Sequence, residues 1–296
     1  MTIIPFSKFF TAFALGAFAL CINSCAFKSI NRSKNITYLP ADASGTKPAQ
    51  RLNIFAPKKK NELKPVLVFM HGGSWNSGKK GLYSFFGTRF ARKDVLTVIA
   101  DYPKSPGANF DEMALDVALA VKWVKENIAS YGGDPNNIFL SGHSAGGHLA
   151  ALVGIKKDYF RRVGMANPLK GIILIDAAGL DMYGYLSGEG YEEGNTYLKT
   201  FTSDPKQWKE ASPWYFLHDS MPPMLIYRGG RTYPSIEEGN EKFVAAMKPF
   251  VPTPTYQILE GKKHVPMILQ FFNTANPRYK EMIGFMKENK PATEHF

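Results

Sequence analysis

Short, mostly apolar runs recur along the chain, and longer segments with apolar residues at helical spacing lie between them. The runs cover residues 65–70, 95–100, 137–140, 171–175 and 224–227. Helical spacing is clearest over residues 110–131, 146–155 and 237–250. Continuous rather than alternating apolarity is typical of strands buried on both faces. Strands that alternate with helices predict an α/β fold with a mostly parallel central sheet and helices on both faces.

Two segments depart from this alternation. Residues 25–50 are polar and predict a tether followed by a strand that leads into one globular domain over residues 51–290. Residues 182–216 are rich in Tyr, Trp, Gly and Glu without a clean period, which indicates a small lid-like insertion over one end of the sheet. Its aromatic residues are suited to an apolar substrate pocket, and plain packing is an equally good interpretation.

The N-terminal residues have the pattern of a targeting segment. Residues 1–24 are typical of an export signal, because Lys8 precedes an apolar run over residues 9–20 that is short for a transmembrane helix. Ile22-Asn23-Ser24-Cys25 resembles a bacterial lipoprotein box, although its Asn occupies a slot that usually holds a smaller residue. We expect lipidation of Cys25 and anchoring to a bacterial envelope membrane on the extracytoplasmic, periplasmic side. An ordinary cleaved signal and an uncleaved anchor are the alternatives.

Composition and charge narrow the class of protein only slightly. With 296 residues and 45% hydrophobic content, the chain is far too apolar to be disordered. Its 36 Lys and Arg against 25 Asp and Glu give a net charge of +11. These basic residues form short clusters outside any recognisable nucleic-acid-binding module, which favours a solvated surface and no nucleic-acid partner. The oligomeric state stays open.

The strongest chemical signal is Gly142-His143-Ser144-Ala145-Gly146, between a predicted strand and a predicted helix. A serine between glycines at such a junction can occupy the strained turn that lifts its hydroxyl clear of the sheet. We therefore expect Ser144 to be a catalytic nucleophile.

A second signal is His71-Gly72-Gly73-Ser74-Trp75, directly after an earlier predicted strand. Consecutive glycines let backbone amides face a cavity and stabilise a developing oxyanion. We expect the amides of Gly72, Gly73 and Ala145 to form this oxyanion hole. Ser74, Trp75 and His143 flank these elements and are expected to line the substrate pocket.

A nucleophilic serine needs a base, and His264 is the best placed of the six histidines. It follows the strand-like residues 255–259 and precedes a helical segment, at the end of the sheet where ligands bind. No spacing of His, Cys or carboxylate residues indicates a metal site.

Together these motifs resemble those of α/β-hydrolases, in the esterase branch that includes hormone-sensitive-lipase-like enzymes, arylformamidases and bacterial feruloyl-esterase-like proteins. The matching pieces also include residues 101–103, 131–135, 212–213 and 222–224, so the resemblance runs from about residue 51 to residue 286. It implies a carboxylesterase that cleaves small or aromatic small-molecule esters through an acyl-enzyme, without metal or organic cofactor.

One element of that family is missing. The triad Asp usually follows the strand at 222–227, but here the chain continues Arg228-Gly229-Gly230-Arg231-Thr232 without a carboxylate. Losing the acid of such a triad costs a factor on the order of 10⁴ in rate in one protease. Asp181, near the end of the preceding strand, is the first candidate for a replacement and Glu237 is its rival. A Ser–His dyad or another acid is the remaining possibility.

The resemblance leaves two alternatives to an esterase. An arylformamidase-like amidase or a peptidase uses the same acyl-enzyme chemistry. A catalytically silent member that binds a ligand is the other alternative, and the missing Asp favours it.

Overall fold

The structure is a computed structural model, and it describes residues 29–44, 46–58, 62–190, 195–251 and 254–291. Its strands are β1 (Ile30–Leu39), β2 (Gln50–Pro57), β3 (Lys64–Met70), β4 (Leu96–Ala100), β5 (Gly133–His143), β6 (Leu169–Ile175), β7 (Met224–Gly229) and β8 (Thr255–Leu259). Its helices are α1 (Ser84–Ala91), α2 (Phe110–Asn127), α3 (Ala145–Ile155), α4 (Asp158–Arg162), α5 (Met182–Glu189), α6 (Thr196–Phe201), α7 (Pro205–Glu210), α8 (Pro234–Met247), α9 (His264–Leu269) and α10 (Arg278–Glu288). The 3₁₀ helices are η1 (Lys80–Tyr83), η2 (Ile128–Tyr131), η3 (Pro213–Phe216) and η4 (Gln270–Phe272).

The strands form one eight-stranded sheet in the order β1-β2-β4-β3-β5-β6-β7-β8. β2 runs antiparallel to β1 and β4, and every other neighbouring pair is parallel. The continuous apolar runs correspond to β3 through β7, where burial on both faces requires them. The predicted mostly parallel α/β sheet is therefore confirmed.

The start of the domain lies earlier than the composition indicates. Residues 30–39, within the segment expected to hold a tether and an entry strand, form β1 and pair with β2. β1 is an edge strand with half of its residues exposed and one buried, so it needs few large apolar side chains. The sheet therefore begins at Ile30, in the segment where the entry strand was expected. The signal segment and Cys25 lie outside the described residues; in the described ranges, no helix is both long and apolar enough to cross a membrane.

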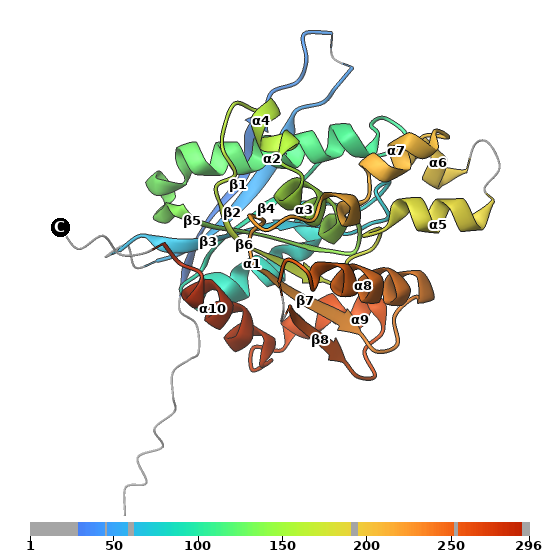
Figure 1. Cartoon of the computed structure of the whole chain (residues 1–296). Helices are drawn as coiled ribbons and strands as arrows, with labels where there is room; N and C mark the ends of the chain where they lie inside the picture. The colour runs from blue at the N-terminus through green and yellow to red at the C-terminus, as the bar shows by residue number, and fades with distance from the viewer. Residues whose placement is uncertain (1–28, 45, 59–61, 191–194, 252–253, 292–296) are drawn as a thin grey trace, which may run out of the picture.

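Helices cover both faces of the sheet (Figure 1). Buried residues of α2, α3 and α8 share one core with one face of the strands, as Val117, Leu149 and Phe243 illustrate. Residues of α1, α9 and α10 form the core on the other face, as Phe86 and Met282 illustrate. The middle of the sheet is thus enclosed by helices on both faces. The carboxyl ends of its parallel strands are where a site can form.

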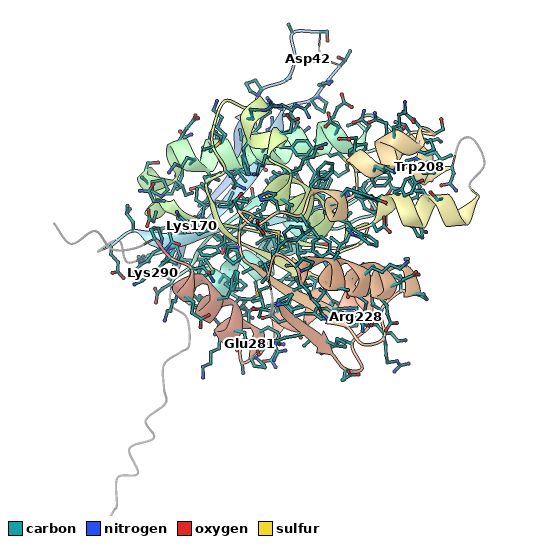
Figure 2. All side chains as sticks on the ribbon, in the orientation of Figure 1. Asp42, Lys170, Trp208, Arg228, Glu281 and Lys290 are labelled. Carbon is teal, nitrogen blue, oxygen red and sulfur yellow. The ribbon has the colours of Figure 1, made fainter. Side chains whose placement is uncertain are left out.

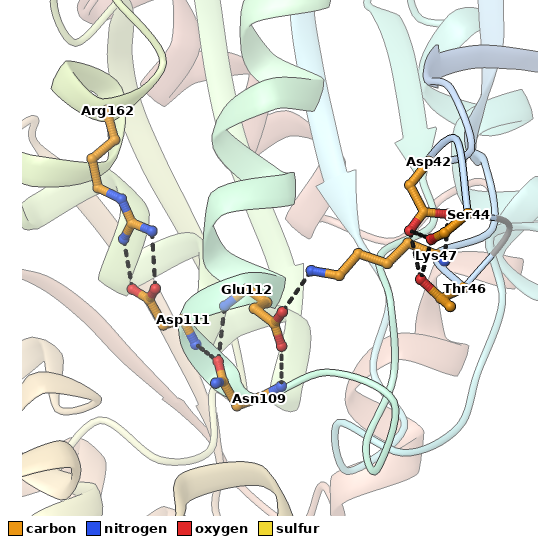
Figure 3. A network of polar contacts seen from close by, with 8 residues as sticks. All are labelled: Asp42, Ser44, Thr46, Lys47, Asn109, Asp111, Glu112 and Arg162. Carbon is orange, nitrogen blue, oxygen red and sulfur yellow. Dashed lines mark hydrogen bonds and ion pairs between the residues drawn. The ribbon is translucent and has the colours of Figure 1, made fainter.

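A cluster of polar side chains fixes the start of α2 (Figure 3). The Asn109 side chain accepts hydrogen bonds from the amides of Asp111 and Glu112, and the Glu112 carboxylate accepts one from the Asn109 amide. Lys47, in the loop between β1 and β2, binds Glu112 at 2.7 Å, and Arg162 binds Asp111. The cluster caps α2 and holds the β1–β2 loop against it.

The predicted insertion folds into α5, α6, α7 and η3, and its three α-helices gather at one end of the sheet (Figure 1). Its buried Phe201 ring packs edge-on against Trp75, with ring centroids 4.9 Å apart. The insertion therefore reaches the glycine-rich segment that follows β3.

Candidate active site

Ser144 occupies a strained turn between β5 and α3. Its backbone has φ 56° and ψ −124°, a conformation that non-glycine residues rarely adopt. The turn is held by hydrogen bonds from the Ser144 amide to the Ile175 carbonyl (3.2 Å) and from the amides of His148 and Ala178 to the Ser144 carbonyl (3.0 and 3.2 Å). Such strain persists only where surrounding structure enforces it, and here it presents the hydroxyl at the edge of the sheet.

Two glycines allow this turn to approach its neighbours. A Cβ atom at Gly146 would lie 2.2 Å from the Met70 carbonyl oxygen, so α3 can start against the end of β3 only without a side chain there. A Cβ atom at Gly72 would lie 3.2 Å from the Ser144 Cβ atom. The glycine-rich segment and the serine turn are therefore in direct contact, as the sequence predicts.

Ser144, His264 and Asp176 form a continuous hydrogen-bonded row. His264 Nε2 lies 2.9 Å from Ser144 Oγ, and His264 Nδ1 lies 2.6 Å from Asp176 Oδ2. Asp176 directly follows β6 and is fully buried. Its carboxylate also accepts hydrogen bonds from the Gly229 amide (2.7 Å) and the Thr232 hydroxyl (2.5 Å). The buried charge is thus satisfied by three donors, and one of them is the imidazole.

Both acids expected from the sequence lie elsewhere. Asp181 accepts a hydrogen bond from the Gly184 amide at 2.9 Å and caps the start of α5. Glu237 binds Arg228 Nη1 at 2.6 Å, in a cluster beside β7 and α8 that Figure 2 labels by Arg228. The expectation of Asp181 or Glu237 against His264 is wrong, because these carboxylates serve a helix cap and an ion pair. No dyad is needed, because Asp176 fills the third place.

A sequence signal for Asp176 existed. β6 ends at Ile175, so Asp176 is the first residue beyond the apolar run 171–175. A carboxylate in that place faces the ligand edge of a parallel sheet. Reading the strand as extending toward residue 181 moved the expected acid five residues too far.

A second histidine packs against His264. The rings of His143 and His264 are stacked with centroids 4.7 Å apart, and His143 Nε2 donates a hydrogen bond to the His264 carbonyl at 3.2 Å. Burial, with the nearby His264, lowers the pKa of His143 from 6.5 to about 3. His143 therefore stays neutral and holds the base in place without competing for its proton.

One of the three amides expected to form an oxyanion hole already has a hydrogen-bond partner. The Gly72 amide donates a hydrogen bond to the Tyr83 hydroxyl at 3.1 Å, so Gly72 is not an available donor. Within the part of the chain that the structure describes, the amides of Gly73 and Ser74 donate no hydrogen bond. The Ala145 amide opens α3, where helix geometry supplies no partner. Tyr83 was not identified from the sequence, because its contact with Gly72 arises only in the folded chain.

Buried side chains anchor the glycine-rich segment from behind. His71 lies 3.5 Å from the Asp101 carboxylate and stacks on Tyr102, whose hydroxyl donates to the His71 carbonyl at 2.9 Å. Burial alone would raise the pKa of Asp101, but hydrogen bonds from His71 and Lys80 lower it well below the usual range. The segment is thereby fixed before any ligand arrives.

A cavity of about 990 Å³ opens beside Ser144 and His264. Ser74, Trp75 and His143, the expected pocket residues, all line it. Tyr185 and Tyr197 come to it from the insertion. Among the described residues, no group of three or more His, Cys, Asp or Glu side chains is placed to hold a metal ion.

The buried His148 holds Trp75 in the lining of the cavity. Its indole Nε1 donates to His148 Nδ1 at 3.1 Å, and His148 Nε2 donates to the Ala211 carbonyl at 2.7 Å. Burial lowers the pKa of His148 from 6.5 to about 4, so the ring stays neutral and can accept from Trp75. The imidazole of His148 therefore links α3 to the insertion and to Trp75 of the cavity lining.

Sequence comparisons match the chain to one family model and to proteins named as esterases. The BD-FAE family model matches residues 52–233. Isoprenylcysteine alpha-carbonyl methylesterase ICME of Arabidopsis thaliana is 28% identical over 249 residues, covering 76% of this chain and 56% of that protein. Esterase LipQ of Mycobacterium tuberculosis is 30% identical over 193 residues, covering 62% of this chain and 46% of that protein. The chain spans about half the length of the curated relatives it matches.

Solved structures show the same fold. A truncated carbohydrate esterase from gut microbiota has a TM-score of 0.73 at 19% identity, over 88% of this chain and 96% of that one. Esterase B from Lactobacillus rhamnosis has a TM-score of 0.69 at 17% identity, over 88% of this chain and 87% of that one. The strand order and these neighbours show an α/β-hydrolase fold.

Proposed function

The chain belongs to the BD-FAE family, and on that basis we propose that it is a serine esterase that cleaves carboxylic esters through an acyl-enzyme on Ser144. The observation that carries the proposal is the row Ser144 Oγ, His264, Asp176, with distances of 2.9 and 2.6 Å. A serine hydroxyl becomes nucleophilic when an imidazole can take its proton and a carboxylate holds that imidazole.

The mechanism uses only groups of this chain. His264 Nε2 takes the hydroxyl proton while Ser144 Oγ attacks the ester carbonyl carbon. Asp176 accepts the Nδ1–H hydrogen bond and stabilises the imidazolium that forms. The amides of Gly73 and Ala145 stabilise the oxyanion. His264 then gives its proton to the alcohol oxygen as the bond from that oxygen to the carbonyl carbon breaks. In the second half, His264 takes a proton from a water molecule whose oxygen bonds to the acyl carbon, and returns it to Ser144 Oγ as the bond from Ser144 to that carbon breaks.

Two features support esters as the substrates. The named relatives are esterases, which favours esters over the amides and peptides that the same chemistry also cleaves. The pocket wall contributed by Trp75, Tyr185 and Tyr197 suits a small or aromatic acyl group. The alternative of a silent binding protein rested on a missing acid, and Asp176 removes that argument.

The experiment is pre-steady-state hydrolysis of 4-nitrophenyl acetate. The proposal predicts a nitrophenol burst of one equivalent per chain and an acetyl adduct on Ser144. Ser144→Ala lowers kcat by at least about 10⁴-fold, the loss typical of removing such a nucleophile. Ser141→Ala is the matched control. Ser141 is buried in β5, three residues before Ser144, and its hydroxyl has no hydrogen-bond partner among the described residues. Its activity is expected to stay within about twofold of wild type. Equal activity of the Ser144→Ala variant would reject the proposal.

We propose further that Cys25 carries a lipid anchor that holds the enzyme at the extracytoplasmic side of an envelope membrane. The support is the export signal over residues 1–24 and the box Ile22–Cys25. Cys25→Ala is expected to move the full chain from the membrane pellet to the supernatant and to abolish incorporation of labelled fatty acid. Retention of label in Cys25→Ala would contradict this assignment.

A further inference from the structure

The cavity beside Ser144 has two ends of different character. At the end next to the insertion, Trp75 is 3% exposed, and its ring packs against Tyr197 and Phe201. Tyr185 packs in turn on Tyr197, with ring centroids 5.5 Å apart. This enclosed end has a fixed depth, because Trp75 is also hydrogen-bonded to His148.

The other part of the cavity lining, called the open end below, is exposed and apolar. It is lined by Leu82 of η1, Val265 and Leu269 of α9, and Phe272 of η4, whose exposed fractions run from 45% to 59%. The ring of Phe272 stacks on that of Phe85, with centroids 3.8 Å apart. Single exposed apolar side chains are ordinary on a protein surface, but a contiguous group at the mouth of a reactive cavity marks a binding surface.

The position of His264 indicates which part of an ester lies at the open end. His264 is the first residue of α9, and Val265, Leu269 and Phe272, which follow it in the chain, line the same cavity. In the acylation step the bond between the carbonyl carbon and the alcohol oxygen breaks, while a bond from Ser144 Oγ to that carbon forms. The departing oxygen takes the proton held by His264 Nε2, so the alcohol leaves on the His264 side.

Resting on the proposed esterase function, we infer that the open end binds a long aliphatic alcohol chain and that the enclosed end takes a compact acyl group. The substrate class is therefore an ester of a small or single-ring acid with a long-chain alcohol. Its chain would cover the apolar side chains that the free enzyme leaves in water.

The test compares two series of esters below their aggregation concentrations. One series holds acetate constant and lengthens the alcohol from two to eight carbons, and the other holds ethanol constant and lengthens the acid. Each methylene buried from water is worth about fourfold in kcat/KM. The inference predicts a rise of about this size per carbon in the alcohol series and a clearly smaller rise in the acid series.

Variants tie the slope to named side chains. Leu82→Ser and Phe272→Ser are expected to lower the ratio of kcat/KM for octyl acetate to that for ethyl acetate by about tenfold each. Ile258→Ser is the matched control, because Ile258 is a 40% exposed apolar residue on β8 that does not line the cavity. It leaves both rates unchanged. Thermal melting of each variant verifies folding, and the second variant serves if one fails to fold.

Three results overturn the inference. A steeper rise in the acid series would reverse the two ends, and a ratio unaffected by both variants would remove the open end as the binding surface. No rise below the aggregation concentration, with a jump in rate when the octyl ester is raised above it, would assign the apolar residues to a lipid interface instead. Absence of any Ser144-dependent hydrolysis would reject the esterase proposal itself, which separates the two failures.

Discussion

The ends of β6 and β7 lie next to each other at one edge of the sheet, and they contribute to the site in different ways. β6 is followed by Asp176, whose fully buried carboxylate binds His264 at 2.6 Å. β7 ends at Gly229, whose amide binds Asp176, and the loop beyond it supplies the Thr232 hydroxyl. In the enzymes that the chain resembles, the acid usually follows β7. Here β6 carries the charge and β7 carries its donors.

In this comparison a carboxylate reaches His264 Nδ1 from the end of β6 and not of β7, so its place in space decides the contact and not the strand that it follows. Neighbouring strands are about 4.8 Å apart, so a short side chain after either one can reach the same imidazole nitrogen. Asp176 has φ 49°, and its amide donates to the Tyr227 carbonyl at 2.7 Å. The chain therefore turns sharply at the end of β6 while still hydrogen-bonded to β7, and this aims the carboxylate at His264.

The largest expected effect distinguishes Asp176, which binds His264, from Asp181, the acid expected from the sequence. Asp176→Asn should lower kcat/KM for 4-nitrophenyl acetate by about 10³- to 10⁴-fold, because the amide cannot stabilise the imidazolium. Asp181→Asn keeps the cap of α5 and should stay within about twofold of wild type. Steady-state kinetics with a melting curve for each variant decide this. Comparable losses in the two variants would contradict the assignment.

Moving the acid to the other strand end should restore part of the rate. Thr232 Oγ1 lies 2.5 Å from the Asp176 oxygen that binds His264, so a carboxylate at position 232 can reach toward Nδ1. The double variant Asp176→Ser with Thr232→Asp is expected to be at least about tenfold faster than Asp176→Ser alone, one order of the loss described for a triad acid. A double variant as slow as the single one would show that only the β6 end can position the acid.

Removing one donor from the β7 side should have a smaller effect. Thr232→Val deletes one hydrogen bond to a buried carboxylate, which is worth about 1.5–3 kcal/mol for a charged acceptor. The Gly229 amide and His264 still bind the carboxylate and compensate part of this loss, so we expect kcat/KM to fall about fivefold to tenfold, or about 1–1.4 kcal/mol, with KM little changed. Thr232→Ser is the control that keeps the hydroxyl. A Thr232→Ser variant as slow as Thr232→Val would assign the effect to packing.

The end of β5 supplies a pH test on the same edge. Burial lowers the pKa of His143 from 6.5 in the unfolded chain to about 3 in the folded chain. Below pH 6.5 the unfolded chain therefore binds a proton that the folded chain does not bind, and this lowers the free energy of unfolding. The stability that the neutral ring contributes is complete above pH 6.5 and declines as the pH falls toward 3. Between pH 6.5 and 4, wild type should lose up to about 3 kcal/mol more free energy of unfolding than His143→Gln. Urea titrations across that range measure this.

The sequence predicted the parts of the fold that depend on local patterns. β3 to β7 follow from continuous apolar runs, and α2, α3 and α8 follow from helical spacing. Ser144 was found because Gly-x-Ser-x-Gly describes a turn that its own residues impose. The entry strand was expected before residue 51 but without bounds, because an edge strand such as β1 needs little apolar character.

The missed site features depend on contacts between distant residues. Asp176 and His264 are 88 residues apart, and nothing near either residue specifies their pairing. The Tyr83 hydroxyl that occupies the Gly72 amide, and the His148 ring that holds Trp75, likewise arise from packing between separate elements. The ends of the predicted strands were the available guide to the acid. The end of β6 was placed too far along the chain, which moved the predicted acid from Asp176 to Asp181.

The most direct test of the central claim is the rate at which a fluorophosphonate probe labels Ser144 in the folded chain, with the modified peptide identified by mass spectrometry. The account predicts one adduct, on Ser144, formed rapidly in wild type and at least about 100-fold more slowly in His264→Ala, since base catalysis is worth about 10²–10⁴-fold. His218→Ala, which alters a histidine bonded to the Ile155 carbonyl, is the control and should label at the wild-type rate. Absence of label from the folded wild type, or equal labelling of His264→Ala, would contradict an activated serine at this site.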